Sequence, residues 1–367
     1  MNKKQESDQS AIIKLQSYKK LVDKEFKAFF KKQLVESKKI DNSAYQMTKF
    51  LKEFNLRGGK RIRAALIFYG FKCFSNKKSD DKDLLKVSIA MELIQSFLLI
   101  HDDIIDRDEL RRCGPTSHKF FEEIGEKDFK FETDINEKKH FGTAMAIFAG
   151  DLCAALANTI LTKIKIANKN EVIYEINKII RNTTFGQIID VRSGYDNIFS
   201  EKTTLKIYKL KTANYSIELP LKMGAILAGA TEKEIKKIKK YAEPLGIAFN
   251  IQDDLLELFG EKKKFGKPMG SDLKEGKKTL VILKTLEKST KKEALFIKKN
   301  LGNKNISKKD IEKIKKIMIE TGAFDYCIKY AKSLIKKANA IIAKQNYKPE
   351  GKSFLIGIGN YLLERKY

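Results

Sequence analysis

The sequence predicts an all-α protein that forms a single large helical bundle, with about a dozen helices around a central cavity. Apolar residues recur at helical spacing along most of the chain, as in Leu84, Val87, Met91, Ile94 and Leu98. Strand-like alternation of apolar and polar residues is hardly visible. Only five prolines occur, and no Gly/Ser-rich or Pro-rich linker divides the 367 residues. We therefore expect one domain over residues 1–367, with residues 1–40 as an N-terminal extension that is helical or partly disordered.

Several helix boundaries are marked by capping residues and glycines. Ser307, with Asp310 three positions later, is typical of a helix N-cap, and breaks occur near Gly58, Gly260 and Gly302. Residues 84–100 are apolar on most faces, which predicts a helix buried in the middle of the bundle. Residues 126–139 are polar and charged between two helical patterns, so we expect a solvent-exposed loop there.

The chain is strongly basic, with 74 lysines and arginines against 47 acidic residues and a formal charge of +27. Such a charge can indicate nucleic acid, an anionic membrane surface or anionic substrates as partners. A nucleic-acid or membrane-surface binder would carry basic and aromatic residues interleaved in one contiguous stripe, and the sequence shows only diffuse charge. We therefore expect no nucleic-acid partner.

Cysteine usage and hydropathy favour a cytoplasmic protein. The four cysteines are widely separated and show neither a CxxC motif nor Cys/His metal spacing. The N-terminal residues are polar and lack the roughly 7–15 apolar residues of a signal peptide. No window reaches about 18 uninterrupted apolar residues, so no stable membrane insertion is expected.

An acidic cluster follows directly after an apolar run in the stretch LLIHDDIIDRDELRR, residues 98–112. Asp102 and Asp106 are four positions apart, so they lie on one helix face with Asp103 beside them. Carboxylates this close raise one another's pKa and repel unless a cation lies between them. The pattern therefore predicts a metal site.

The acidic pattern recurs once, in NIQDDLLELFG, where Asp253, Asp254 and Glu257 follow another apolar helical stretch. One such pattern can arise by chance on an exposed helix, but two copies facing each other across a bundle would resemble helical metal sites built from inward carboxylates. Oxygen ligands favour Mg²⁺, with Mn²⁺ as a possible substitute, over zinc. Because Mg²⁺ prefers a few carboxylates together with substrate phosphates, a phosphorylated substrate is predicted.

Basic residues at marked positions agree with anionic substrates. The glycines before Lys60 let backbone N–H groups approach an anion closely. No Ser/His/Asp or cysteine nucleophile is evident. The basic residues concerned are Arg57, Lys60, Arg61, Arg63, Arg111, Arg112, Lys211, Lys267 and Lys277.

Nine pieces of sequence follow one another between residue 57 and the C-terminus: GGKRIR, ELIQSFLLIHDDIID, RRCGPTSH, HFGTAMAIFAGD, FGQIID, LKTANY, LGIAFNIQDDLLELFG, FGKPMGSDLKEGKKT and ERKY. In these pieces, their order and their spacing the chain resembles the trans-type isoprenyl (polyprenyl) diphosphate synthases. The resemblance implies an enzyme that joins isopentenyl diphosphate to an allylic diphosphate. The allylic diphosphate ionises with Mg²⁺ assistance, the isopentenyl double bond attacks the carbocation, and a proton is lost.

The resemblance also assigns roles to the acidic and basic residues. It implies that the metals are held by Asp102, Asp103, Asp106, Asp253, Asp254 and Glu257. It implies that the allylic diphosphate binds through these metals and Arg111, Lys211 and Lys267, and that Thr212 faces the cation. It places isopentenyl diphosphate against Gly59, Lys60, Arg63, Gln95 and Arg112, without metal. Family members usually form homodimers, so we also expect a dimer.

Three positions depart from the usual family pattern. Glu257 replaces the last Asp of the second motif, and because Glu is still a hard oxygen ligand we expect a shifted metal geometry. Asn250 stands where Gln is common, and Cys113 replaces a Gly after the arginine pair. His101 precedes the first cluster but points about 100° away around the helix, which favours packing over metal ligation. Tyr208 lies at a helical position that predicts core packing.

Product length is predicted from the residues just before the first cluster. A growing prenyl tail should run along the helix that carries Asp102, and Phe97 lies five residues earlier, about 7 Å along the axis. In the family, an aromatic residue there with a non-aromatic residue such as Leu98 next to it resembles twenty-carbon synthases. We therefore favour geranylgeranyl diphosphate, with farnesyl diphosphate as the alternative. A non-catalytic partner subunit of a heteromeric synthase is a weaker alternative because both acidic clusters are present, and a terpene cyclase would not need the isopentenyl site.

Overall fold

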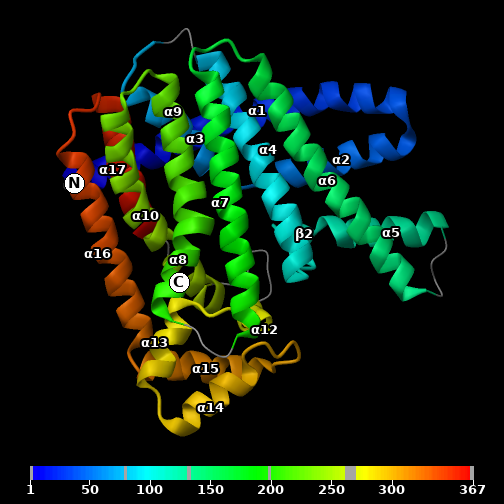
Figure 1. Ribbon diagram of the computed structural model, residues 1–367, viewed down its shortest axis with the longest axis vertical. Coiled ribbons are helices and arrows are strands. Elements are labelled where there is room, and N and C mark those ends of the chain that lie inside the picture. The colour runs from blue at the N-terminus through cyan, green and yellow to red at the C-terminus, as the bar shows by residue number, and fades with distance from the viewer. Residues whose placement is uncertain (1–2, 78–80, 130–133, 197–199, 261–269, 364–367) are drawn as a thin grey trace. The chain divides into compact units, whose positions relative to one another are not determined.

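The computed structural model describes residues 3–77, 81–129, 134–196, 200–260 and 270–363, which are almost entirely helical (Figure 1). The chain divides into two compact units. The N-terminal unit comprises Leu15–Phe68 and Lys77–Lys169. The C-terminal unit comprises Met1–Lys14, Tyr69–Asn76 and Asn170–Tyr367. The predicted all-α class is confirmed, and the strands of the described residues are limited to one two-stranded pair.

The N-terminal unit is built on two long helices that pack against each other, α4 (Asp81–Asp106) and α6 (Ile135–Lys163). α5 (Ser117–Phe129) packs on α6, and α2 (Asn42–Leu56) contacts both α4 and α6. The short strands β1 (Leu110–Arg111) and β2 (Gly114–Pro115) form an antiparallel pair just after α4. The unit also contains the residues of α1 (Lys3–Ile40) from Leu15 onward and those of α3 (Ile62–Lys72) up to Phe68.

The helix predicted to be buried in the middle of the bundle is confirmed as α4. By length and composition both α4 and α6 could cross a membrane, but 67% of the apolar window of α4 is buried inside the protein. The corresponding share for α6 is 33%, and Ile147 and Phe148 on this helix are exposed. α4 therefore has the burial of a core helix, whereas α6 keeps an apolar face uncovered in the single chain.

The prediction of a loop at residues 126–139 is wrong for most of the residues in this range that the structure describes. α5 continues to Phe129, and α6 begins after Asp134, whose carboxylate accepts N–H bonds from Asn136 at 2.9 Å and Glu137 at 3.1 Å. The charged residues belong to exposed helix ends, which sequence composition does not distinguish from a loop. Residues 130–133 lie outside the described part of the chain. The 1–40 extension is helical from Lys3 onward.

The C-terminal unit is organised around α10 (Glu232–Phe259), which packs against both α16 and the helix η2. The predicted N-cap at Ser307 is confirmed, because its hydroxyl accepts the N–H of Asp310 at 3.1 Å. The helices of this unit are α7 (Lys169–Tyr195, from Asn170), α8 (Glu201–Ile207), η2 (Tyr208–Glu218), α9 (Leu219–Leu227), α10, α12 (Ser271–Glu275), α13 (Leu280–Lys288), α14 (Lys291–Asn300), α15 (Lys308–Glu320), α16 (Ala323–Ala343) and α17 (Pro349–Leu363).

The helix η2 is an eleven-residue π-helix that lies very close to its two neighbours. Gly246 on α10 faces it so closely that an added Cβ would clash with the backbone of Ala213 and lie 2.5 Å from the Ala213 Cβ. Gly186 on α7 similarly leaves room for Leu210 and Lys211, since a Cβ there would be 2.8 Å from the Leu210 Cβ. π-Helical turns are rare and occur frequently at functional sites. The two glycines thus allow the close contacts that fix η2 in place.

Replacing Gly246 with Ala should disturb this contact and destabilise the protein. We expect the free energy of unfolding to fall by roughly 1–3 kcal/mol, because the new methyl group meets backbone atoms that cannot move aside easily. Thermal or urea unfolding measures the change. Gly194→Ala in α7 is the matched control, because the nearest atom to its new Cβ is the Glu275 carbonyl oxygen at 3.8 Å. A Gly246→Ala protein as stable as the Gly194→Ala protein would contradict the close packing described here.

Candidate active site

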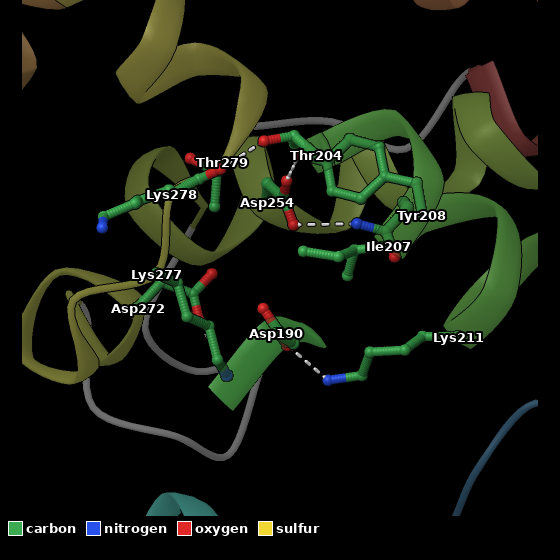
Figure 2. Close-up of a pocket in the computed structure, with 11 residues that line it drawn as sticks. Asp190, Thr204, Ile207, Tyr208, Lys211, Asp254, Asp272, Lys277, Lys278 and Thr279 are labelled. Carbon is green, nitrogen blue, oxygen red and sulfur yellow. Dashed lines mark hydrogen bonds and ion pairs between the residues drawn. The ribbon is translucent and has the colours of Figure 1, made fainter. Parts of the chain in front are cut away.

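A polar cavity of about 130 Å³ opens within the C-terminal unit (Figure 2). Its walls come from the end of α7, from α8 and η2, from the last turns of α10, and from α12 with the segment that leads into α13. The cavity therefore collects residues from the pieces FGQIID, LKTANY, NIQDD and SDLKEGKKT. The lining residues are Asp190, Thr204, Ile207, Tyr208, Lys211, Asn250, Asp254, Asp272, Lys277, Lys278 and Thr279.

The second acidic cluster lies on the last turns of α10, and hydrogen bonds to its neighbours fix the orientation of Asp254. Asn250 Nδ2 donates to Asp254 Oδ1 at 3.2 Å, and the Tyr208 hydroxyl donates to Asp254 Oδ2. The Thr212 hydroxyl in turn donates to Asn250 Oδ1. Asn250, which departs from the family's usual Gln, thus links Thr212 to the acidic cluster.

The carboxylates of this cluster hold unusual pKa values because they are crowded and poorly solvated. Burial, followed by the charge of Asp272, raises the pKa of Asp254 well above its ordinary value. Burial and Asp272 also raise the pKa of Glu257 to about 7. Glu257 Oε1 accepts the Ser271 N–H at 2.5 Å and the Ser271 hydroxyl at 3.0 Å. Its buried Oε2 has no hydrogen-bond partner among the described residues.

These carboxylates fit a divalent cation. The donor set consists of oxygen atoms, one of which is buried and has no hydrogen-bond partner among the described residues, and the carboxylates are buried close to the negative charge of Asp272. A bound Mg²⁺ ion would supply the missing positive charge through the type of ligand that it prefers. The departure at Glu257 is compatible with this interpretation, because the longer side chain still presents an oxygen atom.

Three lysines border the same cavity. Lys211 Nζ is 2.6 Å from Asp190 Oδ2, a pair that Figure 2 shows at one edge of the cavity. Lys277 Nζ lies 3.4 Å from Asp272 Oδ1 and also pairs with Glu275. Lys278 instead donates to the carbonyl oxygens of Ser193 and Asp196, so it ties the end of α7 to the segment before α13.

Some residues of this site were predicted and others were missed. Lys211, Thr212, Asp254 and the adjacent acids were predicted from the acidic pattern and the family resemblance. Asp190 and Asp272 were missed, although both lie inside pieces that carry the resemblance. Single carboxylates without a partner at helical spacing gave no local signal. Lys267 lies outside the described residues.

The first acidic cluster lies at the C-terminal end of α4 in the N-terminal unit. Asp103 is fully buried, and Arg111 Nε donates to its Oδ1 at 2.5 Å. Burial lowers the pKa of Arg111, but the charge and hydrogen bond of Asp103, together with the charges of Asp102 and Asp108, raise it above its ordinary value. Asp102 and Asp106 are only partly buried. Asp103 is therefore held by Arg111, while its two neighbours are more open to solvent.

A tight turn between β1 and β2 orients the arginine pair. Arg112 and Cys113 both have positive φ angles, 52° and 60°, as the central residues of a type I′ hairpin turn do. Gly114 follows, and an added Cβ there would lie 2.6 Å from Arg57 Nη1. Cys113 thus occupies a backbone conformation that favours Gly or Asn, and its side chain is exposed.

The turn brings Arg112 against the glycine pair before Lys60 within the N-terminal unit. Arg112 Nη1 donates to the Gly58 carbonyl at 3.3 Å, and the absence of a side chain on Gly59 leaves room for the guanidinium group. Burial lowers the pKa of Arg112 to about 10, and the positive charges of Arg61, Arg111 and Arg63 act in the same direction. An anion bound here would relieve that repulsion.

Two further residues of the N-terminal unit bear on the predicted isopentenyl site. Arg61 is buried and pairs with Glu92 at 2.7 Å and Asp23 at 2.9 Å, so its charge is already compensated within the unit. Gln95 is buried, and its Oε1 accepts no hydrogen bond from any residue that the structure describes. The predicted isopentenyl site comprises Gly59, Lys60, Arg63, Gln95 and Arg112, and of these the structure brings the Arg112 guanidinium against Gly59.

Aromatic packing surrounds the residues predicted to set product length. Phe97 and Leu98 are partly buried on α4, and the Phe97 ring meets the His101 ring edge-on at 4.9 Å between centroids. His101 Nε2 lies 3.3 Å from the Ile147 carbonyl oxygen and 3.7 Å from Asp151 Oδ1 on α6. The His101 ring therefore packs between α4 and α6, in agreement with the packing role predicted for it.

Comparison with known proteins agrees with this combination of helical fold and acidic and basic sites. A sequence profile of the family described as polyprenyl synthetase matches residues 45–318. The short chain isoprenyl diphosphate synthase of Methanocaldococcus jannaschii is 35% identical over 302 residues, which cover 81% of this chain and 80% of that protein. The geranylgeranyl diphosphate synthase of Sulfolobus acidocaldarius is 31% identical over 297 residues, 79% of this chain and 82% of that protein.

A solved structure is similar over nearly the whole chain. Geranylgeranyl pyrophosphate synthase from Corynebacterium glutamicum, complexed with isoprenyl diphosphate and magnesium, gives a TM-score of 0.87 at 28% identity, covering 96% of this chain and 99% of that one. The chain therefore belongs to the polyprenyl synthetase family. Within that family it is a short-chain isoprenyl diphosphate synthase, a prenyltransferase.

Proposed function

We propose that this prenyltransferase condenses isopentenyl diphosphate with an allylic diphosphate in a Mg²⁺-dependent reaction whose product is geranylgeranyl diphosphate. The observation that carries the proposal is the set of crowded, poorly solvated carboxylates at the end of α10. Divalent cations would bind such carboxylates and offset their mutual repulsion. The crowded arginines around Arg112 support a second, metal-free anion site. The related structure complexed with isoprenyl diphosphate and magnesium supports both substrate and metal.

Each group of residues has a distinct task in this proposal. Mg²⁺, for which Mn²⁺ could substitute, would supply Lewis acidity that neutralises the departing diphosphate. The metal ligands are Asp102, Asp103, Asp106, Asp253, Asp254 and Glu257, and the allylic diphosphate is bound by Arg111, Lys211 and Lys267. Isopentenyl diphosphate is bound by Gly59, Lys60, Arg63, Gln95 and Arg112.

The reaction itself needs little covalent chemistry from the protein. The diphosphate leaves the allylic carbon with the bonding electron pair, and the isopentenyl double bond then forms the new C–C bond. The carbocation that results loses a proton to the released diphosphate, and the new double bond forms from the electrons of that C–H bond. Thr212, whose hydroxyl hydrogen is engaged by Asn250, presents its oxygen lone pairs toward the positive charge. The side chains act by preorganised electrostatics, which is the largest catalytic effect in many enzymes.

Incubation of the purified protein with isopentenyl diphosphate, farnesyl diphosphate and Mg²⁺ tests the activity. We expect a twenty-carbon product after dephosphorylation and chromatography, and none when the metal is removed with a chelator. Asp253→Ala should lower kcat by roughly 100-fold or more through loss of a metal ligand.

Lys60→Ala tests the predicted isopentenyl diphosphate site, whereas Asp253→Ala tests the metal site. It should raise the KM for isopentenyl diphosphate roughly 10-fold, because one charge-assisted hydrogen bond in the metal-free site is lost. Failure of the parent enzyme to extend any allylic diphosphate would exclude the proposed reaction. An unchanged KM in Lys60→Ala would exclude only the assignment of the isopentenyl site.

Product length is proposed to depend on Phe97. Replacing Phe97 with Ala should remove the aromatic floor beneath the growing tail and lengthen the product by at least one five-carbon unit. Chromatography against prenyl alcohol standards measures this change. Phe97→Tyr, which keeps the ring, should retain the parent length. The same product from Phe97→Ala and the parent would show that another residue sets the length. With a shorter allylic diphosphate as the starter, a parent product of fifteen carbons would favour the farnesyl alternative.

We further propose that the protein is a cytoplasmic homodimer with one domain over residues 1–367, and that it neither binds nucleic acid nor inserts stably into membranes. The family match crosses both compact units, which supports a single domain. Large apolar side chains are exposed on α6 and α7, and a second copy would cover them. They are Ile147, Phe148, Tyr174, Phe185, Ile188 and Tyr195.

A charged substitution on the exposed apolar face of α6 should prevent dimer formation. Sedimentation velocity at micromolar concentration should show a dimer for the parent and a shift toward monomer for Phe148→Glu, whose parent side chain is 62% exposed. Leu295→Glu on α14 is the control, because Leu295 is 69% exposed and lies outside the two helices. A monomeric parent would contradict the dimer.

A further inference from the structure

The side chain of Tyr208 is buried at the junction of three elements of the C-terminal unit. The residue begins η2, only 4% of it is exposed, and it lines the cavity beside the second acidic cluster. Its hydroxyl donates to Asp254 Oδ2 on α10 and accepts the N–H of Leu280, the first residue of α13, at 2.8 Å. One hydroxyl group therefore connects η2, α10 and α13.

The direction of the hydrogen bond to Asp254 follows from simple donor counting. A tyrosine hydroxyl has one hydrogen to donate and lone pairs that accept. Because the backbone N–H of Leu280 can only donate, the Tyr208 oxygen accepts there and its hydrogen remains for Asp254.

A second contact holds the other oxygen of the same carboxylate. Asn250 Nδ2 donates to Asp254 Oδ1 at 3.2 Å, and Asn250 is held in turn by the Thr212 hydroxyl. Tyr208 and Thr212 are four residues apart on η2, and Asn250 and Asp254 are four residues apart on α10. The four side chains form a chain of hydrogen bonds between the two helices, and both carboxylate oxygens of Asp254 are oriented by protein donors.

We propose that Tyr208 is a positioning residue that orients Asp254 for divalent-metal binding and joins the acidic cluster to the Lys277–Thr279 segment. This inference rests on the proposed function and goes beyond it, since no role in the reaction was assigned to Tyr208. Groups that hydrogen-bond to metal ligands restrict their orientation, and their loss typically weakens metal affinity or activity. The segment from Lys277 to Thr279 lines the same cavity and ends at the N–H that Tyr208 accepts.

Tyr208→Phe removes this hydroxyl and keeps the buried ring. The matched control is Tyr241→Phe on the same helix as Asp254, because Tyr241 is fully buried and its hydroxyl donates to the Leu355 carbonyl at 2.7 Å. Each variant loses one buried hydroxyl and the hydrogen bond that this hydroxyl donates. Thermal unfolding in metal-free buffer establishes that both variants are folded and compares their loss of stability.

Calorimetric titration of Mg²⁺ into protein with inorganic diphosphate supplies a readout that does not depend on turnover. We expect Tyr208→Phe to bind Mg²⁺ roughly 10-fold more weakly than the parent, and Tyr241→Phe to bind like the parent. In kinetics, Tyr208→Phe should lower kcat and require more Mg²⁺, with the KM for isopentenyl diphosphate unchanged.

A double-mutant cycle identifies the group through which Tyr208 acts. In an Asp254→Asn background, adding Tyr208→Phe should produce little further loss of Mg²⁺ affinity, because the carboxylate that it orients is gone. Equal Mg²⁺ affinity in Tyr208→Phe and the parent, or fully additive losses in the cycle, would overturn the inference while leaving the proposed function intact. A parent protein that binds no Mg²⁺ with diphosphate would overturn both.

Discussion

Crowded and poorly solvated carboxylates at the end of α10 are the structural feature on which the rest of the cavity depends. Asp254 and Glu257 are poorly solvated and lie near Asp272, and the neighbouring lysines do not prevent the rise of their pKa values. Burying like charges costs free energy unless a counter-charge is present. Under the proposed function, bound divalent cations would supply that counter-charge. The arginines around Arg112 follow the same principle with the opposite sign of charge, because a bound anion would reduce the repulsion between them.

Close backbone contacts keep these charges in fixed positions. Gly246 and Gly186 let η2 approach α10 and α7, and this approach places Lys211 and Thr212 beside the acidic cluster. In the N-terminal unit, Gly59 and Gly114 make room for Arg112 and Arg57 in a similar way. Small residues therefore determine where the large charged ones can lie, and each charged group is supported by a rigid helix or turn.

The sequence predicted the features that depend on local chemistry. Helical periodicity predicted the all-α class and the buried α4, and the prediction of a metal site came from the repulsion expected between carboxylates that share a helix face. The charged stretch 126–139 was misinterpreted as a loop because an exposed helix end has the same composition. The π-helical conformation of η2 and the left-handed turn at Arg112 depend on tertiary contacts, which no local pattern reports. Tyr208 was correctly predicted to be buried, but its hydroxyl partners come from 46 and 72 positions away.

The turn at Arg112 and Cys113 also offers an exposed thiol for site-specific labelling. Cys73, Cys153 and Cys327 are buried, and burial raises the pKa of each thiol to about 12, so these thiols are protected from alkylating reagents. Cys113 alone among the four cysteines is exposed, and it is covalently adjacent to Arg112. A thiol-reactive fluorophore would therefore attach at one position without any engineered substitution. The natural sequence thus provides an attachment point for an optical probe next to Arg112.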